Sequence, residues 1–182
     1  DYRGARETAI KETAEKIKES ALSVVMFTDH EKLPDLDFVI ELTRLTGRTI
    51  LRGVELNVFV DAWSKPEGKI EKSLFFHVLV GFDPEEDADY ALKNIYQECR
   101  SEDRKLQSET IKGICDFKKL CETAPKFGAL IIPAHLHSTS DAFKSRSIDD
   151  IYSDAEFLKL CPHFTALEVT SQTTASFFDG KH

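Results

Sequence analysis

The hydrophobic positions of the chain follow two periods, one typical of helices and one typical of strands. In residues 6–21 the apolar side chains recur every three or four positions with Lys and Glu between them, which predicts an amphipathic helix. Residues 22–27 form a short apolar run rich in β-branched side chains, which predicts a buried strand. A second helix is predicted over residues 35–46, because Pro34 is suited to its start and Gly47 to its end.

The rest of the chain alternates in the same way between strand and helix patterns. Long strands are predicted over residues 49–60 and 74–82, with a charged loop between them. Residues 86–124 are charged and helical in pattern, with a break near residues 101–105. The remaining predictions are a buried strand at 129–134, a loop at 138–147, a helix at 149–160 and a strand at 165–170.

This alternation predicts an α/β domain with a largely parallel sheet or a barrel. The length of 182 residues suits one domain, so residues 1–182 are expected to form a single folding unit. In such folds ligands bind at the carboxyl ends of the strands, which makes the residues found there the first candidates for chemistry.

Composition and charge narrow the function. Asp and Glu outnumber Lys and Arg by 32 to 24, so the chain does not have the basic balance of a protein that holds nucleic acid by bulk charge. An anionic substrate would have to be attracted locally, by a metal or a small basic cluster. The sequence has no apolar run that could span a bilayer and no signal-peptide pattern. The four cysteines fit no zinc or redox spacing, so we expect reduced thiols in a cytoplasmic protein that is not bound to a membrane.

Four potential metal ligands fall on or directly after four predicted strands. His30 and His135 each follow a strand, whereas Glu55 and His77 lie within strands. Strand alternation predicts that His77 lies on the face opposite Phe76 and Val78. A carboxylate inside a strand is costly to bury unless it is paired or bound to a metal. Arg52 is a possible ion-pair partner for Glu55, and each histidine also has an ordinary interpretation as a hydrogen-bonded side chain. Imidazole and carboxylate together suit Zn, Mn or Fe, so convergence of the four would indicate a metal site.

The segments around these residues resemble the motifs of the PHP family, the polymerase and histidinol phosphatase superfamily of metal-dependent phosphoesterases. The matching segments are T-D-H at 28–30, R-G-V-E at 52–55, F-H-V-L-V-G-F at 76–82 and P-A-H at 133–135. The resemblance implies a distorted seven-stranded TIM-like (β/α) barrel with two or three divalent metal ions, Mn, Zn or Fe. It implies that the metal ligands are His30, Glu55, His77 and His135, and that Asp29 lies close to the metals and orients a ligand.

Two motifs of this family are missing, an H-x-H on the first strand and a D-x-H on a late strand. We therefore expect the chain to be a fragment of a longer protein that lacks the first and last motif strands. A weaker resemblance joins it to PHP domains at the N-terminus of large TrlF-like ABC- or SMC-type ATPases, which are linked to nucleic-acid processing or phage defence. The ATPase would then lie downstream in the same protein.

The resemblance implies hydrolysis of a phosphate ester, with metal ions lowering the pKa of an attacking water. A phosphodiester substrate, as in a nuclease, is the first hypothesis. Two alternatives stay open: a small-molecule phosphomonoesterase like histidinol phosphatase, and a non-catalytic module attached to an ATPase.

Overall fold

The computed structural model describes residues 2–63, 72–100, 104–106, 109–111, 114–134 and 161–166. Along the chain its elements are α1 (Tyr2–Glu19), β1 (Val24–His30), α2 (Leu36–Thr46), β2 (Thr49–Trp63), β3 (Lys72–Phe82), α3 (Ala88–Cys99), β4 (Arg104–Leu106), β5 (Glu109–Ile111), β6 (Cys115–Asp116), α4 (Phe117–Thr123), η1 (Ala124–Phe127), β7 (Leu130–Ala134) and η2 (Cys161–His163). The predicted loop at 138–147, the predicted helix at 149–160 and most of the predicted strand at 165–170 lie outside the described residues. None of the described helices is long and apolar enough to cross a membrane.

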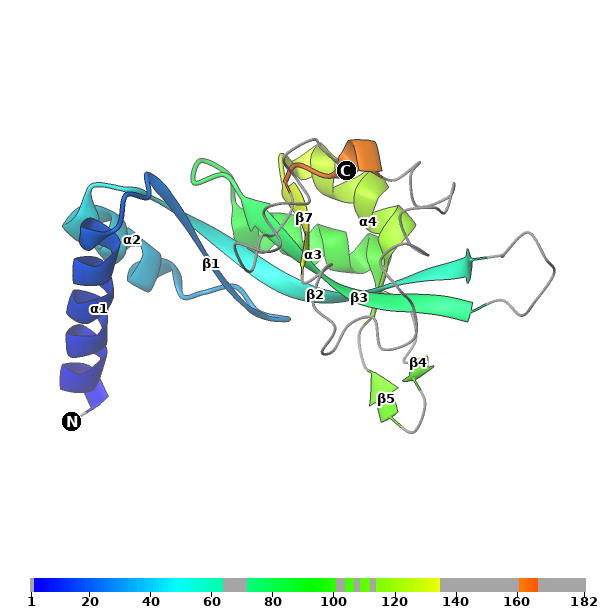
Figure 1. Ribbon diagram of the computed structural model, residues 1–182, viewed down its shortest axis with the longest axis horizontal. Coiled ribbons are helices and arrows are strands. Elements are labelled where there is room, and N and C mark those ends of the chain that lie inside the picture. The colour runs from blue at the N-terminus through cyan, green and yellow to red at the C-terminus, as the bar shows by residue number, and fades with distance from the viewer. Residues whose placement is uncertain are drawn as a thin grey trace, which may run out of the picture.

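The main sheet is mixed, and its strands lie in the order β1-β2-β3-β7 (Figure 1). β1 runs parallel to β2, whereas β2 pairs with β3, and β3 with β7, in the antiparallel sense. The α/β class is therefore confirmed. Of the described strands of this sheet, β1, β2, β6 and β7 run in one direction and β3 runs against them, so the sheet departs from the expected parallel arrangement at β3. Only residues 64–71 separate β2 from β3, which is too short for the crossover that parallel strands need. The sheet formed by the described strands is open, so these residues do not show the predicted barrel.

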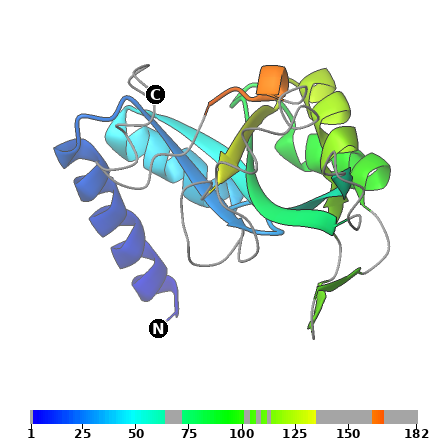
Figure 2. The ribbon, with the colours of Figure 1, turned by 45° about the vertical axis from the view of Figure 1, so that its right-hand side comes forward.

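Helices α3 and α4 cover one face of this sheet and create the larger of two hydrophobic cores. Alternate side chains are buried there in residues 54–58 of β2 and 76–82 of β3, as strand geometry requires. These buried strand residues are Val54, Leu56, Val58, Phe76, Val78, Val80 and Phe82. A smaller core joins α1 and α2 to the start of β2. Figure 2 shows α1 and α2 gathered at one end of the sheet and α3 and α4 at the other.

Short polar signals fix where the helices begin and end. Asp35, Asp87 and Asp116 cap α2, α3 and α4, and each carboxylate accepts a hydrogen bond from a backbone N–H in the first turn. Gly47 ends α2 in the left-handed conformation, with φ of 64°. The predicted start and end of the second helix are thus confirmed.

Two segments differ from the prediction in the type of element. β1 does not end at residue 27 but continues to His30, because its backbone pairs with β2 as far as Glu55. Between residues 104 and 116, where a helix was expected, the described residues form β4, β5 and β6. β6 pairs with β2 and its Cys115 is fully buried, so tertiary pairing outweighs the local helical pattern there.

The burial and length of the first strands also differ from the prediction. Leu22 and Val24 are more than half exposed, because β1 lies at the edge of the described sheet and has a strand on one side only. β2 continues to Trp63 and β3 begins at Lys72, so the predicted loop between them is shorter than the pattern indicated.

Candidate metal centre

The predicted ligands lie on the face of the sheet that α3 and α4 do not cover. Val54 and Leu56 point into the larger core, so Glu55 between them points to the opposite face. His77 alternates in the same way between the buried residues of β3, which confirms the facing predicted from the sequence. The register aligns His30 of β1 with Glu55 of β2. Three strands therefore bring three of the predicted ligands to one region of one face.

The carboxylate of Glu55 lies between the two imidazole rings. Its Oε1 is 2.9 Å from Nδ1 of His77, and its Oε2 is 3.7 Å from Nε2 of His30. The two rings meet edge to face, with centroids 5.5 Å apart. Exposure of the side chains rises from 13% for Glu55 through 26% for His77 to 67% for His30. The site thus has a buried carboxylate at its base and an imidazole at its open side.

Arg52 does not pair with Glu55, so this ordinary interpretation of the buried carboxylate is wrong. Residues 52 and 55 are three apart in a strand, which places their side chains on opposite faces. The guanidinium of Arg52 donates to the carboxylate of Asp89 at 2.7 Å and to the carbonyl of Pro34 at 3.0 Å. The described side chains within ion-pair distance of Glu55 include two imidazoles, which also bind metals.

His135 lies outside the described residues, but the chain leading to it is described. Ala134, its neighbour, ends β7 and pairs with His77 in the register of the sheet. Asp29 is exposed, and strand alternation points its side chain away from the face that carries His30. The metal-binding roles of His30, Glu55, His77 and His135 and the orienting role of Asp29 stay predictions. His163, which matches none of the family's motifs, is exposed.

A divalent metal ion requires nitrogen and oxygen donors at a defined spacing. Two donors that each lie about 2.1 Å from one ion are about 3.0–3.4 Å apart. The two distances from Glu55 to the histidines, 2.9 and 3.7 Å, bracket this spacing. Within the described residues, however, no group of three or more His, Cys, Asp or Glu side chains is arranged to hold a metal ion. The donor types suit such an ion, the two distances lie just outside the range it would impose, and a complete ligand set needs residues beyond these three.

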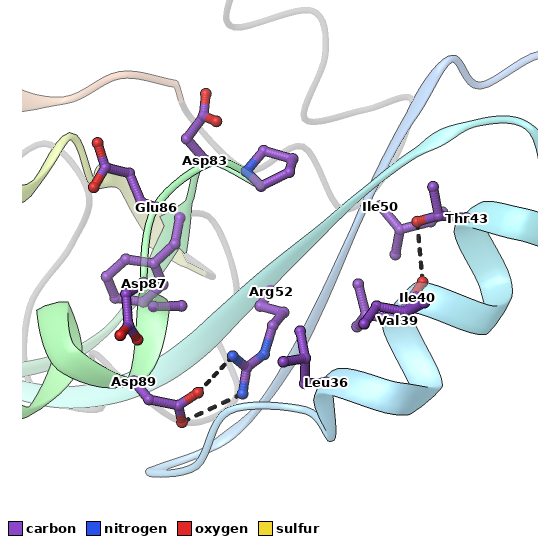
Figure 3. Close-up of a pocket in the computed structure, with 13 residues that line it drawn as sticks. Leu36, Val39, Ile40, Thr43, Ile50, Arg52, Asp83, Glu86, Asp87 and Asp89 are labelled. Carbon is purple, nitrogen blue, oxygen red and sulfur yellow. Dashed lines mark hydrogen bonds and ion pairs between the residues drawn. The ribbon is translucent and has the colours of Figure 1, made fainter.

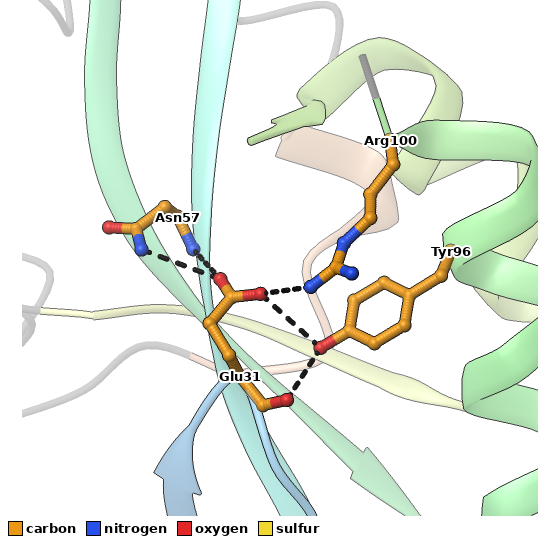
Figure 4. Close-up of polar contacts among 4 residues, drawn as sticks. All are labelled: Glu31, Asn57, Tyr96 and Arg100. Carbon is orange, nitrogen blue, oxygen red and sulfur yellow. Dashed lines mark hydrogen bonds and ion pairs between the residues drawn. The ribbon is translucent and has the colours of Figure 1, made fainter. Parts of the chain in front are cut away.

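Sequence reasoning missed Glu31, which follows His30 and has a backbone φ of 58°. Its carboxylate accepts hydrogen bonds from Asn57, Tyr96 and Arg100 (Figure 4). Burial, and after it the nearby carboxylate of Glu31, raise the pKa of Tyr96 above its usual value. The sequence carries no local signal for this cluster, because Tyr96 and Arg100 lie 65 and 69 residues beyond Glu31.

A separate groove of about 490 Å³ lies on the other face of the sheet, between α2 and the segment that leads into α3 (Figure 3). Its base is apolar, and the ion pair of Arg52 with Asp89 crosses it. The described residues that line it are Leu36, Val39, Ile40, Thr43, Ile50, Arg52, Phe82, Asp83, Pro84, Glu86, Asp87, Ala88 and Asp89. None of the predicted metal ligands is among them, so this groove is distinct from the candidate metal centre.

No protein-family model matches the sequence, and the search of curated proteins finds no match. Among solved structures, the chain is similar to a crystal structure from Bifidobacterium adolescentis that is provisionally described as a metal-dependent phosphoesterase. The TM-score is 0.52 at 13% sequence identity, and the match covers 88% of this chain and 70% of the other. At this identity the likeness shows a shared fold.

Proposed function

We propose that this chain is a phosphoesterase that hydrolyses phosphodiesters with the aid of two or three divalent metal ions held on the open face of the sheet. The observation that carries the proposal is the carboxylate of Glu55 placed between the imidazoles of His30 and His77. The shared fold with a protein described as a metal-dependent phosphoesterase supports the same class of reaction. Nucleic acid as the substrate, and a downstream ABC- or SMC-type ATPase in the same protein, are proposed on the sequence motifs alone.

Each of the three described side chains would have a different part in such a site. Glu55 contributes a negative charge that is 13% exposed, so solvent screens it little and it attracts a cation. His77, beside it on the neighbouring strand, fixes the base of the site. His30 is 67% exposed and therefore lies on the side that a substrate approaches. His135 is proposed as the fourth ligand.

Divalent ions in phosphoesterases supply an acidified water and neutralise charge on the phosphate oxygens during displacement. The chain itself has a formal net charge of −8, which repels an anionic substrate at long range. Two neutral histidines around one carboxylate leave a site that becomes positive when divalent cations bind. This local reversal of charge would draw a phosphate ester to the open face.

The test is a comparison of diester and monoester hydrolysis in the presence of Mn²⁺, before and after chelation. We expect bis(p-nitrophenyl) phosphate to be hydrolysed in preference to p-nitrophenyl phosphate, and hydrolysis to stop on chelation. Glu55→Gln and His135→Ala should reduce the rate at least about 100-fold, as loss of a group that stabilises the transition state does. His163→Ala is the matched control, because this histidine is exposed and is not a predicted ligand.

The other possible results of these assays either contradict the proposal or favour one of the two alternative functions. Full activity in both Glu55→Gln and His135→Ala contradicts the proposal. A strong preference for the monoester indicates a small-molecule phosphatase. Binding of Mn²⁺ without hydrolysis of either ester, in the full-length protein, indicates the non-catalytic module.

A further inference from the structure

One edge of β2 is shared by two strands that do not meet. β1 pairs with this edge as far as His30 opposite Glu55, and β6 resumes the pairing at Val58 opposite Cys115. Glu31 lies at the gap between them. Its backbone N–H donates to the carbonyl of Glu55 at 3.0 Å, and its Oε1 accepts from the backbone N–H of Asn57 at 3.3 Å. The carboxylate of Glu31 thus continues the hydrogen bonding along this edge of β2 beyond the end of β1.

The other contacts of Glu31 tie this gap to α3 (Figure 4). Oε2 accepts from the guanidinium of Arg100 at 2.6 Å, and the backbone carbonyl of Glu31 accepts from the hydroxyl of Tyr96 at 3.1 Å. The guanidinium also lies over the Tyr96 ring, 3.8 Å from its centroid. Arg100 is fixed in turn by a backbone bridge to Cys115 of β6. The turn after His30 is therefore held from both β2 and α3.

The backbone of Glu31 is in the left-handed region, which is unfavourable for a residue with a Cβ and is usually taken by Gly or Asn. A strained residue of this kind persists when its surroundings fix it, and such residues cluster at functional sites. The carboxylate of Glu31 already accepts from Asn57, Tyr96 and Arg100, and its charge is balanced by the guanidinium. Its oxygens are therefore committed to the protein and not to an ion.

We infer that Glu31 is a positioning residue for the metal centre, which sets the spacing between His30 and Glu55 through its own side-chain contacts. This inference rests on the proposed function. Glu31 links both ligand-bearing strands: it follows His30 in the chain, its N–H donates to the backbone carbonyl of Glu55, and its carboxylate accepts from the backbone N–H of Asn57, two residues farther along β2. Groups that orient metal ligands in this way typically contribute about 10- to 100-fold to metal affinity.

The inference is tested by Mn²⁺ binding to the full chain, measured by equilibrium dialysis with mass-spectrometric metal analysis, without reference to activity. Glu31→Gly is the informative variant, because it removes the whole side chain with its contacts, and because glycine adopts the left-handed backbone of this position freely. Glu31→Gln, which keeps the shape and one acceptor oxygen, is the second variant in case the first does not fold. Glu41→Ala is the matched control, since it removes the carboxylate of an exposed ion pair with Arg44 on α2.

We expect Glu31→Gly and Glu31→Gln to bind Mn²⁺ about 10- to 100-fold more weakly than the parent chain. Glu41→Ala should bind it normally. The melting temperature of the metal-free Glu31→Gly variant shows whether the loss is one of folding, and we expect it to change little. Parental Mn²⁺ affinity in both Glu31 variants overturns the inference and leaves the proposed function intact. A parent chain that binds no Mn²⁺ in the full-length protein overturns both.

Discussion

The carboxylate of Glu55 offers the sharpest test of the candidate metal centre, because one atom can be changed in a nearly buried position. Glu55→Gln keeps the size of the side chain and an oxygen that faces His77, but removes the negative charge. The side chain of Glu55 is only 13% exposed, so solvent screens the charge of its carboxylate poorly. We therefore expect a loss of metal affinity of about 100-fold, equivalent to about 2.7 kcal/mol.

This loss has a calculable effect on stability. A ligand at 100 times its Kd stabilises the folded state by about 2.7 kcal/mol. If Glu55→Gln weakens Mn²⁺ binding 100-fold, the same concentration stabilises the variant by only about 0.4 kcal/mol. For a chain of this size about 1 kcal/mol corresponds to a change of about 2–4 °C in melting temperature. Mn²⁺ should therefore raise the melting temperature of the parent by about 5–11 °C and that of the variant by about 1–2 °C.

The assay is thermal unfolding followed by differential scanning fluorimetry at several Mn²⁺ concentrations. Glu41→Gln serves as the control, because it neutralises an exposed carboxylate on α2 without touching the candidate site. We expect it to respond to Mn²⁺ like the parent. A Glu55→Gln variant with the full parental shift in melting temperature would refute the assignment of Glu55 as a ligand.

Three further predictions concern the scaffold around the site. Burial raises the pKa of Tyr96 above the usual 10, so above pH 10 the folded state keeps a proton that the unfolded state loses. The free energy of unfolding should therefore fall as the pH rises above 10. In urea unfolding, Tyr96→Phe should show a smaller fall in this free energy than the parent chain. Burial also raises the pKa values of Cys99 and Cys115 to about 11 and about 12. At pH 8 neither thiol should therefore react with a disulfide reagent until the protein unfolds. Peptide mapping that finds either cysteine labelled in the native protein would contradict this prediction. Phe117→Ala removes a fully buried ring and should lower the free energy of unfolding in urea by about 3–5 kcal/mol, whereas a loss below about 1 kcal/mol would show that the larger core does not depend on this ring.

The sequence predicted best what depends on local alternation. The pattern of β3 placed His77 on the face opposite Phe76 and Val78, and the structure has the same facing. The prediction worked because α3 and α4 bury one face of this strand, so hydrophobic side chains occupy every second position in the sequence. The caps of α2 were predictable for a similar reason, since Asp35 and Gly47 act within one turn of the chain. The meeting of His30 with Glu55 followed from the parallel pairing expected of strands that flank a helix.

The sequence could not predict features that depend on distant partners. β6 is two residues long, too short to leave a pattern, and its place is decided by pairing with β2. The antiparallel pairing of β3 with β7 joins strands that are separated by α3, α4 and three short strands. Glu31 was not predicted as a functional residue because an acidic residue after a strand is ordinary in sequence. Its importance lies in contacts with Tyr96 and Arg100, which only the folded chain brings together.

The hairpin formed by β2 and β3 has a consequence for the order in which the site assembles. Glu55 and His77 lie on consecutive antiparallel strands, and the pairing of these strands starts at Trp63 opposite Lys72, so it can extend along the hairpin to the two side chains without closing a further loop. His30 joins them only when β1 docks against β2 beyond α2, and β7 pairs with β3 only after a much longer segment has been ordered. Contacts of low sequence separation form early in folding. The carboxylate and one imidazole should thus be paired in the nascent domain before the other strands arrive, which would give a cation a first point of attachment while the chain is still folding.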